Sequence, residues 1–440
     1  MLRQWSPLAA SWLFMTAELV VVVAVIARMP AAELQLAAWG VVFAIATVVQ
    51  APAQALLPTS TALAHDAAAF RRLRGYAWAV LLAVSALHLA LVVTPAYDAL
   101  LGGAMGLPPE VRAAARLPLL LMLPWAFGTG YRRFLQGAII RVGFAGVVIR
   151  GTVVRLAVGV PLLLVGLFTQ ALPGAQVAAA GVIAGVLSEL VYVRWRAAAL
   201  LPRHLGAAAA GSADELAPRR FVAFFWPLVV LALLTMVVQA LVTAVLARMP
   251  LPLASLAVWP AAFGFLVLWQ SPALAYTEAV ISLLRRPAAV PALRRFTWTL
   301  AALLTVGLGL AVATPLADVW FGRVMGLPDD LRAMAGVATL LALALPGLRV
   351  VQSWYQGVIV AAQRTRGISE SVVVFLLVVA AGLGVGVAWA GPAGAYVGTV
   401  AMVAGVAAQT IWLAWRAAPL LAYAKASDGR VVGPGARRNA

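Results

Sequence analysis

The chain contains an internal duplication, because residues 220 positions apart are identical at uncommon residue types. The segment from Pro227 to Pro272 repeats the segment from Pro7 to Pro52. The residues shared with the second copy are Pro7-Leu8, Ala27-Arg28-Met29-Pro30, Trp39, Phe43, Gln50 and Pro52. The same spacing relates Met105-Gly106-Leu107-Pro108 to Met325-Gly326-Leu327-Pro328, and Gln136-Gly137 to Gln356-Gly357. Matches at Trp, Met, Pro and Gln at one fixed spacing indicate two copies of a unit of about 200 residues.

The composition is typical of a membrane protein. Hydrophobic residues make up 64% of the 440 residues and charged residues 10%, whereas soluble domains are about 25% charged. A net charge of +18 does not indicate a nucleic-acid partner, because the basic residues lie in loops between apolar segments. The absence of cysteine excludes disulfides, thiol catalysis and Cys-ligated metal sites. The expected environment is therefore the lipid bilayer.

Apolar segments of about 20 residues predict an all-α protein with twelve transmembrane helices in two parallel six-helix repeats. The predicted spans are 7–27, 34–57, 76–96, 113–131, 147–168, 174–195, 227–247, 254–277, 296–316, 333–352, 370–390 and 393–415. We expect an N-terminal bundle over 1–204, a cytoplasmic linker over 205–220, a C-terminal bundle over 221–423 and a cytoplasmic tail over 424–440.

The loop charges predict the orientation. Clusters such as Arg71-Arg72, Arg132-Arg133 and Arg285-Arg286 lie at one side, whereas Asp98, Glu110, Asp318, Asp329 and Asp330 lie at the other. The positive-inside rule then predicts a multi-pass protein of the cell membrane with both termini in the cytoplasm. An even number of spans in each copy makes the two copies run the same way through the bilayer.

Catalytic motifs are absent from the sequence. There is no Gly-rich phosphate loop with a Lys, no H-E-x-x-H and no G-x-S-x-G in a suitable setting. We therefore expect no enzyme, no cofactor and no metal centre.

Carboxylates inside predicted spans are candidates for ion coupling, because a charge at a helix centre costs about 3 kcal/mol or more. Glu18 lies in the first span and Glu278 at the inner end of the eighth. Each could bind H⁺ or Na⁺, or could instead pair with an Arg or lie at the water boundary. Glu189, whose repeat partner is Gln409, is open to the same two interpretations.

Basic and amide side chains inside the spans are candidates for a substrate cavity. Arg155 in the fifth span and Arg349 in the tenth would favour an anion if they face a cavity. Snorkelling to the headgroups is the alternative. The amides inside or near the spans could line a pathway or join helices by hydrogen bonds, and they are Gln50, Gln54, Gln136, Gln239, Gln270, Gln352 and Gln356. The cavity candidates among them are Gln50, Gln54, Gln136, Gln270 and Gln356.

Several of these residues carry a family resemblance. Trp5-Ser6-Pro7, Phe225-Trp226-Pro227-Leu228 and the parallel six-helix copies resemble the multidrug/oligosaccharidyl-lipid/polysaccharide (MOP) exporter superfamily, which includes the MATE exporters. The second half is most similar to progressive ankylosis (ANK) transporters, through Val245–Arg248, Pro346–Arg349 and Gly391–Ala395. The resemblance implies V-shaped MATE-like bundles, a central cavity, alternating access and, for ANK-type members, export of anions such as pyrophosphate, nucleotides or citrate. Only Glu18 and Glu278 match the MATE coupling carboxylates by location.

Together these observations predict a secondary exporter that works by alternating access at the interface of the two bundles. Its substrate is expected to be a small organic or phosphate-bearing anion, with H⁺ or Na⁺ as the coupling ion. The alternatives are a flippase for a lipid-linked saccharide and a cation-coupled multidrug exporter. A membrane-embedded transferase is disfavoured because the predicted outer loops contain no His, and a channel is disfavoured because the two halves contain no repeated charged ring.

Overall fold

The chain folds into helices. The computed structural model describes residues 16, 18–144, 146–205, 217–284, 289–362, 366–389 and 391–426. Within these ranges every regular element is a helix. The elements of the first repeat copy are α2 (Ala32–Val49), α3 (Ala51–Gln54), α4 (Leu56–Leu63), α5 (Ala67–Val93), α6 (Ala96–Asp98), η1 (Ala99–Ala104), α7 (Pro109–Leu121), α8 (Leu123–Arg141), α9 (Gly146–Thr169) and α10 (Gly174–His204).

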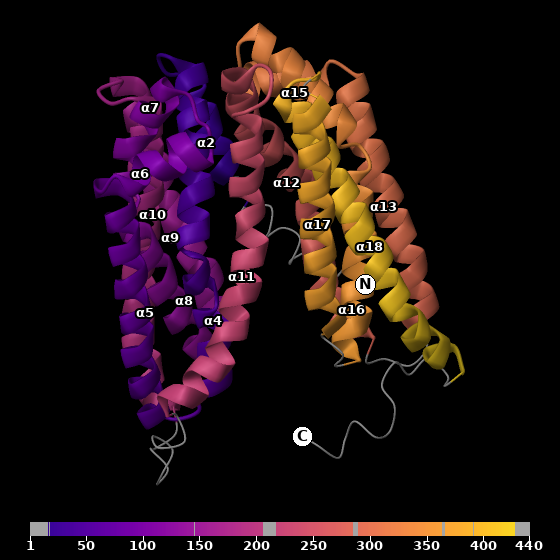
Figure 1. Cartoon of the computed structure of the whole chain (residues 1–440). Coiled ribbons are helices and arrows are strands. Elements are labelled where there is room, and N and C mark those ends of the chain that lie inside the picture. The colour runs from indigo at the N-terminus through magenta and orange to yellow at the C-terminus, as the bar shows by residue number, and fades with distance from the viewer. Residues whose placement is uncertain are drawn as a thin grey trace. The chain divides into compact units, whose positions relative to one another are not determined.

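The second copy repeats this order, and Figure 1 shows the long helices of both copies. Its elements are α11 (Pro218–Leu246), α12 (Pro252–Leu283), α13 (Ala289–Ala313), α14 (Leu316–Asp318), η3 (Val319–Val324), α15 (Asp329–Leu341), α16 (Leu345–Ala361), α17 (Arg366–Trp389) and α18 (Gly394–Ala426).

The predicted membrane spans are confirmed over the described residues. Nine helices are long and apolar enough to cross a membrane, and two bent pairs, α7 with α8 and α15 with α16, raise the number to eleven. The bends measure 42° and 41° and lie beside Pro124 and Pro346, as expected from proline at the start of the second helix. In the predicted first span, 7–27, residues 7–15 and 17 lie outside the described residues, and residues 18–26 are helical.

Several helices extend beyond the predicted spans: α18 ends eleven residues after residue 415, and α5 begins nine residues before residue 76. Asp66 caps this helix, because its Oδ1 accepts a hydrogen bond from the Ala69 backbone amide at 2.8 Å. The basic residues Arg71, Arg72 and Arg74 continue the helix beyond its apolar part. Hydropathy marks only the apolar part of a helix and therefore missed these two and a half turns.

The repeat is visible in the turn that follows the third predicted span of each copy. The π-helical turns η1 and η3 both lead into a glycine with positive φ, 70° at Gly106 and 74° at Gly326. This conformation costs a glycine nothing, which explains the shared Met-Gly-Leu-Pro sequence. In the first copy the Tyr97 hydroxyl donates to the Arg112 carbonyl at 2.6 Å, and burial raises the pKa of Tyr97 to about 12.

By their contacts the helices form two units. We call Val21–Arg248 with Pro252–Ala257 the N-terminal unit, and Met1–Val20, Met249–Leu251 and Val258–Ala440 the C-terminal unit. Helix α11 belongs to the N-terminal unit: it packs on α2 and α3, and the Phe221 ring lies 4.7 Å from that of Tyr76. The predicted bundle boundaries, which follow the sequence repeat, remain a prediction.

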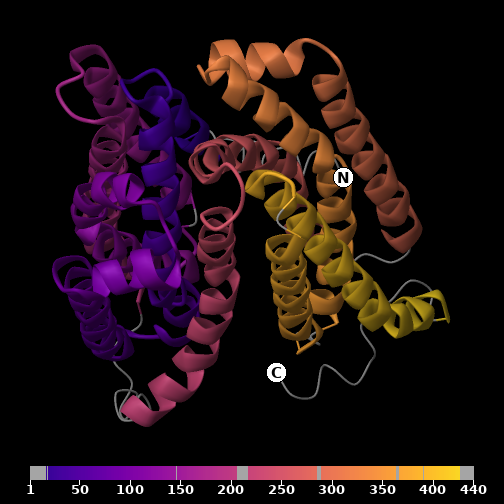
Figure 2. The same cartoon turned by 45° about the horizontal axis from the view of Figure 1, so that its top comes forward.

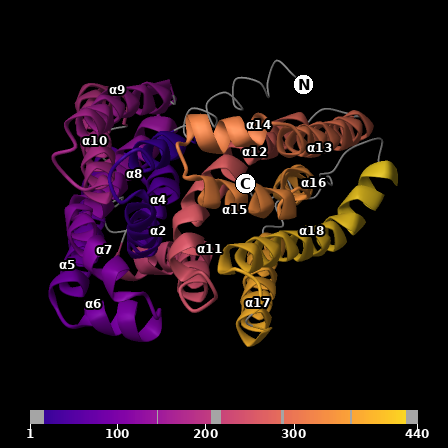
Figure 3. The same ribbon diagram turned by 90° about the horizontal axis from the view of Figure 1, so that it is seen from above.

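Each unit has its own apolar core. In the N-terminal unit the core lies among α4, α5, α8, α10 and α11, and α9 packs closely beside α10 (Figure 3). A Cβ on Gly159 of α9 would lie 3.0 Å from the Gly181 carbonyl of α10, so a small residue permits this contact. In the C-terminal unit the core lies among α12, α13, α16 and α18, and α17 packs along α18 (Figure 2).

Candidate functional site

The candidate site is built around Arg349 of α16. Its Nε donates to Gln270 Oε1 of α12 at 3.0 Å, and its Nη1 donates to Gln352 Oε1 at 2.9 Å. Gln352 lies one turn after Arg349 on the same helix, so α16 supplies both the cation and one of its partners. Gln270 is itself oriented by a 2.9 Å hydrogen bond from its Nε2 to the Leu266 carbonyl. Two amide oxygens thus hold the guanidinium in one place.

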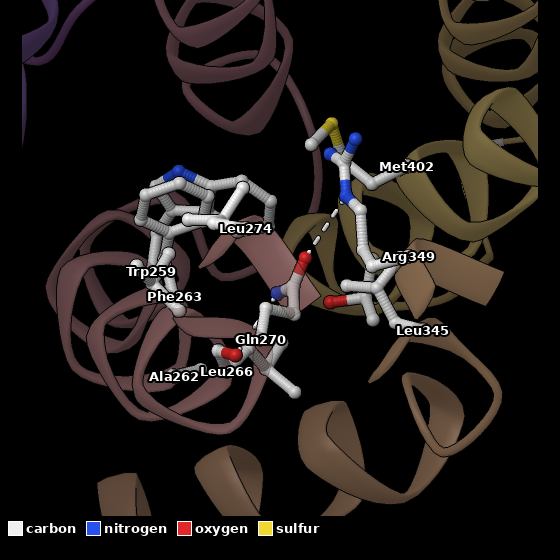
Figure 4. Close-up of a pocket in the computed structure, with 11 residues that line it drawn as sticks. Trp259, Ala262, Phe263, Leu266, Gln270, Leu274, Leu345, Arg349 and Met402 are labelled. Carbon is white, nitrogen blue, oxygen red and sulfur yellow. Dashed lines mark hydrogen bonds between the residues drawn. The ribbon is translucent and has the colours of Figure 1, made fainter. Parts of the chain in front are cut away.

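A cavity of about 200 Å³ opens beside Arg349 within the C-terminal unit. Its walls come from α12, α16 and α18 and are mostly apolar. Figure 4 shows Arg349 reaching toward Gln270, with the rings of Trp259 and Phe263 on the other side of the site. The lining residues are Trp259, Ala262, Phe263, Leu266, Val267, Gln270, Leu274, Leu345, Arg349, Thr399 and Met402. A concave apolar site with a few convergent polar groups has the usual form of a small-ligand pocket.

The charge of Arg349 is not neutralised by the protein. Both of its hydrogen-bond acceptors are neutral amides, and no carboxylate among the described residues forms an ion pair with it. Helix α16 belongs to a bent pair that is apolar enough to cross the membrane. A cation at such a depth costs about 3 kcal/mol or more unless it meets a partner. The site is therefore suited to hold an anion.

The first repeat copy shows that this arrangement is specific to the second. Thr129 occupies the position of Arg349, and Trp125 that of Leu345. The Trp125 ring packs against Phe43, with ring centroids 5.9 Å apart, where the second copy leaves space. Gln50 is buried at the position of Gln270, and its Oε1 finds no hydrogen-bond donor among the described residues. Substitution of two residues in the second copy thus accounts for both the charge and much of the space.

Gln136 belongs to a different cluster, in the N-terminal unit. Its Nε2 donates to Glu189 Oε1 at 3.1 Å, and Arg132 Nη1 donates to Glu189 Oε2. Glu189 is fully buried and Arg132 is 8% exposed, so this ion pair joins α8 to α10 inside the unit. Pairing with an arginine is the second of the two interpretations considered for Glu189. The second copy has Gln352 and Gln409 at the positions of Arg132 and Glu189.

The remaining candidates are not brought together with Arg349. Arg155 of α9 is half-buried in the N-terminal unit, and its backbone packs against Gly185 of α10. Gln54 and Gln356 are half-buried at the end of α3 and within α16. Glu18 is 9% exposed. The side chain of Glu278 lies outside the described residues.

The sequence named Gln352 among the amides inside the spans but did not pair it with Arg349, although their spacing of three residues places both on one helix face. Other residues of the site were missed. Trp259 was interpreted as a packing residue, and Thr399 and Met402 carry no pattern that distinguishes them from other residues of α18. Among the described residues no group of three His, Asp or Glu side chains is arranged to hold a metal ion.

Sequence comparison gives no relative, whereas structural comparison gives many. No family model matches the chain, and no curated protein matches it. An inward-facing multidrug resistance MATE family transporter of the MOP superfamily superposes with a TM-score of 0.66 at 16% identity, covering 94% of this chain and 96% of that one. The lipid II flippase MurJ in an inward closed conformation gives 0.65 at 13% identity, covering 96% and 93%. A MOP superfamily transporter from Pyrococcus furiosus, described as having a binding pocket of reversed polarity, gives 0.60 at 16% identity, covering 93% and 94%.

These likenesses establish the fold. The chain is an all-helical membrane protein with the MATE-like fold found in the MOP superfamily, consistent with twelve membrane helices. An identity of 13% to 16% does not show that two proteins share a substrate, and this fold occurs both in a multidrug resistance transporter and in a lipid II flippase. The predicted relation to ANK-type transporters remains a prediction.

Proposed function

We propose that this protein is a secondary transporter that moves a small organic or phosphate-bearing anion across the membrane. The observation that carries the proposal is Arg349, a guanidinium at membrane depth that is held by two neutral amides beside a cavity. Its N–H groups that are not bonded to Gln270 or Gln352 are available to pair with a carboxylate or phosphate in a bidentate manner. A bound anion would neutralise the buried charge, which supplies a physical reason for affinity.

Alternating access is the mechanism that fits this fold. Two structures of MATE family transporters that superpose on this chain are described as inward-facing and outward-facing conformations. We propose that the two six-helix halves of this chain likewise expose the substrate to one side of the membrane at a time. Glu18, a buried carboxylate, and Glu278 are the proposed sites for a coupling H⁺ or Na⁺.

Two features of the cavity favour a small anion over the alternatives. An unneutralised guanidinium repels a lipophilic cation, which argues against drug-cation export. The cavity of about 200 Å³ is smaller than the 300–1,000 Å³ typical of sites for drug-sized ligands, so a lipid-linked saccharide would not fit within it. The Pyrococcus furiosus transporter described as having reversed pocket polarity shows that this fold tolerates a change in the charge of its site.

Proteoliposome uptake tests the proposal. Purified protein is assayed with pyrophosphate, citrate and nucleotides as anions and with a lipophilic cation, while proton and Na⁺ gradients are varied separately. We expect saturable uptake of at least one anion. Arg349→Thr, which installs the residue of the first repeat copy, should lower its apparent affinity by about 10- to 100-fold, because a hydrogen bond to a charged group contributes about 1.5–3 kcal/mol.

Two further variants sharpen this test. Leu345→Trp should reduce uptake by filling the cavity with the ring that the first copy uses at Trp125. Arg150→Thr is the matched control, because Arg150 is an exposed arginine of α9 that does not line the cavity, and uptake by this variant should stay at the wild-type level. Uptake of the cation alone, or equal anion uptake by Arg349→Thr and the wild-type protein, would refute the proposal.

A further inference from the structure

A second cavity lies in the same unit, near the start of α13. It has a volume of about 390 Å³ and lies among α13, α16 and α18. Val290, Val351 and Leu421 give it apolar walls, and Arg294, Trp298 and Tyr355 give it a polar side. Arg294 lies five residues after the first residue of α13, in the part of the helix that also carries Arg295. The cavity therefore combines a cation with an apolar interior at one end of a membrane helix.

The first repeat copy fills the equivalent place with aromatic rings. Phe70 and Tyr131 stand at the positions of Val290 and Val351. Phe70 stacks on Phe134 with ring centroids 5.3 Å apart, and Tyr131 meets Trp78 edge-on at 5.6 Å. The second copy has lost both rings but keeps the arginine and the tryptophan, which are Arg74 and Trp78 in the first copy. Loss of rings at two neighbouring positions explains why a cavity exists here.

Thr297 of the cavity lining is hydrogen-bonded to Leu293 and Tyr276, whereas two other polar groups have no such partner. Tyr355 stands at the position of Leu135 in the first copy. Its hydroxyl group makes no hydrogen bond with any described residue. Arg294 is exposed and forms no ion pair within the described part of the chain. The Trp298 side chain is 59% exposed, against 40% for Trp78 in the filled copy. The cation and the indole of α13 and the hydroxyl of α16 are the kinds of group that meet lipid headgroups.

The rest of α13 continues the site as an apolar surface. Its side chains Leu303, Val306 and Leu310 are 59% to 66% exposed and lie further along the helix from Trp298. In a bilayer this surface contacts acyl chains. An amphiphile with its anionic head at Arg294 and Tyr355 could thus place the start of a chain in the cavity and the remainder along α13. Each buried CH₂ group of such a chain contributes about 0.8 kcal/mol.

From these observations we propose that the cavity between α13, α16 and α18 is a binding site for an anionic phospholipid. Arg294 and Tyr355 bind the phosphate, and Val290, Val351 and Leu421 contact the acyl chain. The site is separate from the Arg349 cavity, with which it shares no lining residue, and it does not depend on what the protein transports.

Lipid binding to the detergent-purified protein tests this proposal. Native mass spectrometry counts bound lipid, and thermal unfolding compares phosphatidylglycerol, phosphatidylcholine and inorganic phosphate as additives. We expect phosphatidylglycerol to remain bound and to raise the Tm more than phosphatidylcholine does. Arg294→Gln should weaken phosphatidylglycerol binding about tenfold, whereas Arg295→Gln, the neighbouring exposed arginine that does not line the cavity, should retain it.

The double variant Val290→Phe/Val351→Tyr tests the cavity itself. It should fold, because the first copy already packs these residues in this place, and size-exclusion elution and helix content check this. We expect it to lose the bound lipid while keeping both arginines. An equal Tm increase with inorganic phosphate would reduce the site to a simple anion site and overturn the proposal. Lipid retention in the filled variant, or equal losses in Arg294→Gln and Arg295→Gln, would also overturn it.

Discussion

At the scale of single residues, the two repeat copies have different polar side chains at equivalent buried positions. The first copy joins α8 to α10 with the buried pair Arg132 and Glu189. The second copy places Gln352 and Gln409 at these positions, and there Gln409 Nε2 donates to Ser371 Oγ at 3.3 Å. A buried ion pair makes the folded state little more stable than a neutral pair does. Removing only one partner is costly, because the other charge then stays buried without compensation. The charge of Arg349 is the opposite case, since its site contains no protein carboxylate.

This difference predicts a non-additive pair of mutations. Glu189→Gln leaves Arg132 as an uncompensated buried charge and should cost about 3–5 kcal/mol of stability. The double variant Arg132→Gln/Glu189→Gln installs the neutral pair of the second copy and should be more stable than the Glu189→Gln variant. Thermal unfolding of the purified variants measures the cycle. Glu370→Gln, which breaks the more exposed pair with Arg416, is the control and should cause a smaller loss. Additive losses would contradict the buried-pair interpretation.

At the scale of elements, both copies start their second span with the same strained backbone. The residue after each Ala-Arg-Met-Pro segment, Ala31 or Leu251, caps the following helix with a φ of 53°. Neither is a glycine, and the left-handed conformation costs an ordinary residue about 1–2 kcal/mol. Its presence at equivalent positions shows that the turn is imposed by what the helices on either side pack against.

Substitution at this turn should reveal the strain. Ala31→Gly relieves the steric cost and should leave the free energy of unfolding unchanged or raise it by up to about 1 kcal/mol. Ala31→Val adds a branched side chain in the same conformation and should lower it. Ala86→Gly, at an exposed position in the middle of α5, is the matched control and should also lower it, because glycine weakens a helix interior. A lower Tm for Ala31→Gly than for Ala31→Val would rule out backbone strain at this residue.

At the scale of the whole molecule, arginine and acidic residues lie at different helix ends. Arg203 lies at the end of α10, whereas Glu110 and Asp330 lie at the starts of α7 and α15. All three are exposed. The charge distribution predicts that Arg203 faces the cytoplasm and that the two acidic residues face outward.

The absence of cysteine makes this orientation easy to measure, because the wild-type chain is already a cysteine-free background. Single variants Glu110→Cys and Asp330→Cys should react with a membrane-impermeant maleimide in intact cells. Arg203→Cys should react only after permeabilisation. The reverse labelling pattern would invert the predicted topology, and labelling of only one acidic position would show that the two copies run in opposite directions.

The sequence predicted the elements and some of the site. Eleven of the twelve spans could be located because about 20 apolar residues are needed to cross a bilayer, and the helical turns before the apolar part of α5 were missed because they are polar. Arg349 and Gln270 were identified as charged or amide groups inside spans, where each must have a partner. Their mutual contact could not be predicted, because they are 79 residues apart and belong to different helices.

The amino-acid sequence by itself determined that the chain is a duplicated helical membrane protein, because hydrophobic length and a fixed repeat spacing are local properties of a chain. Only the tertiary structure decided which polar groups line a cavity and which are hydrogen-bonded to other side chains inside a unit. Gln136 and Gln270 look alike as buried amides in a span, yet one serves the Glu189 ion pair and the other holds Arg349. Side-chain direction depends on how helices pack. At both cavities of the second copy, smaller side chains stand where the first copy has packed aromatic rings.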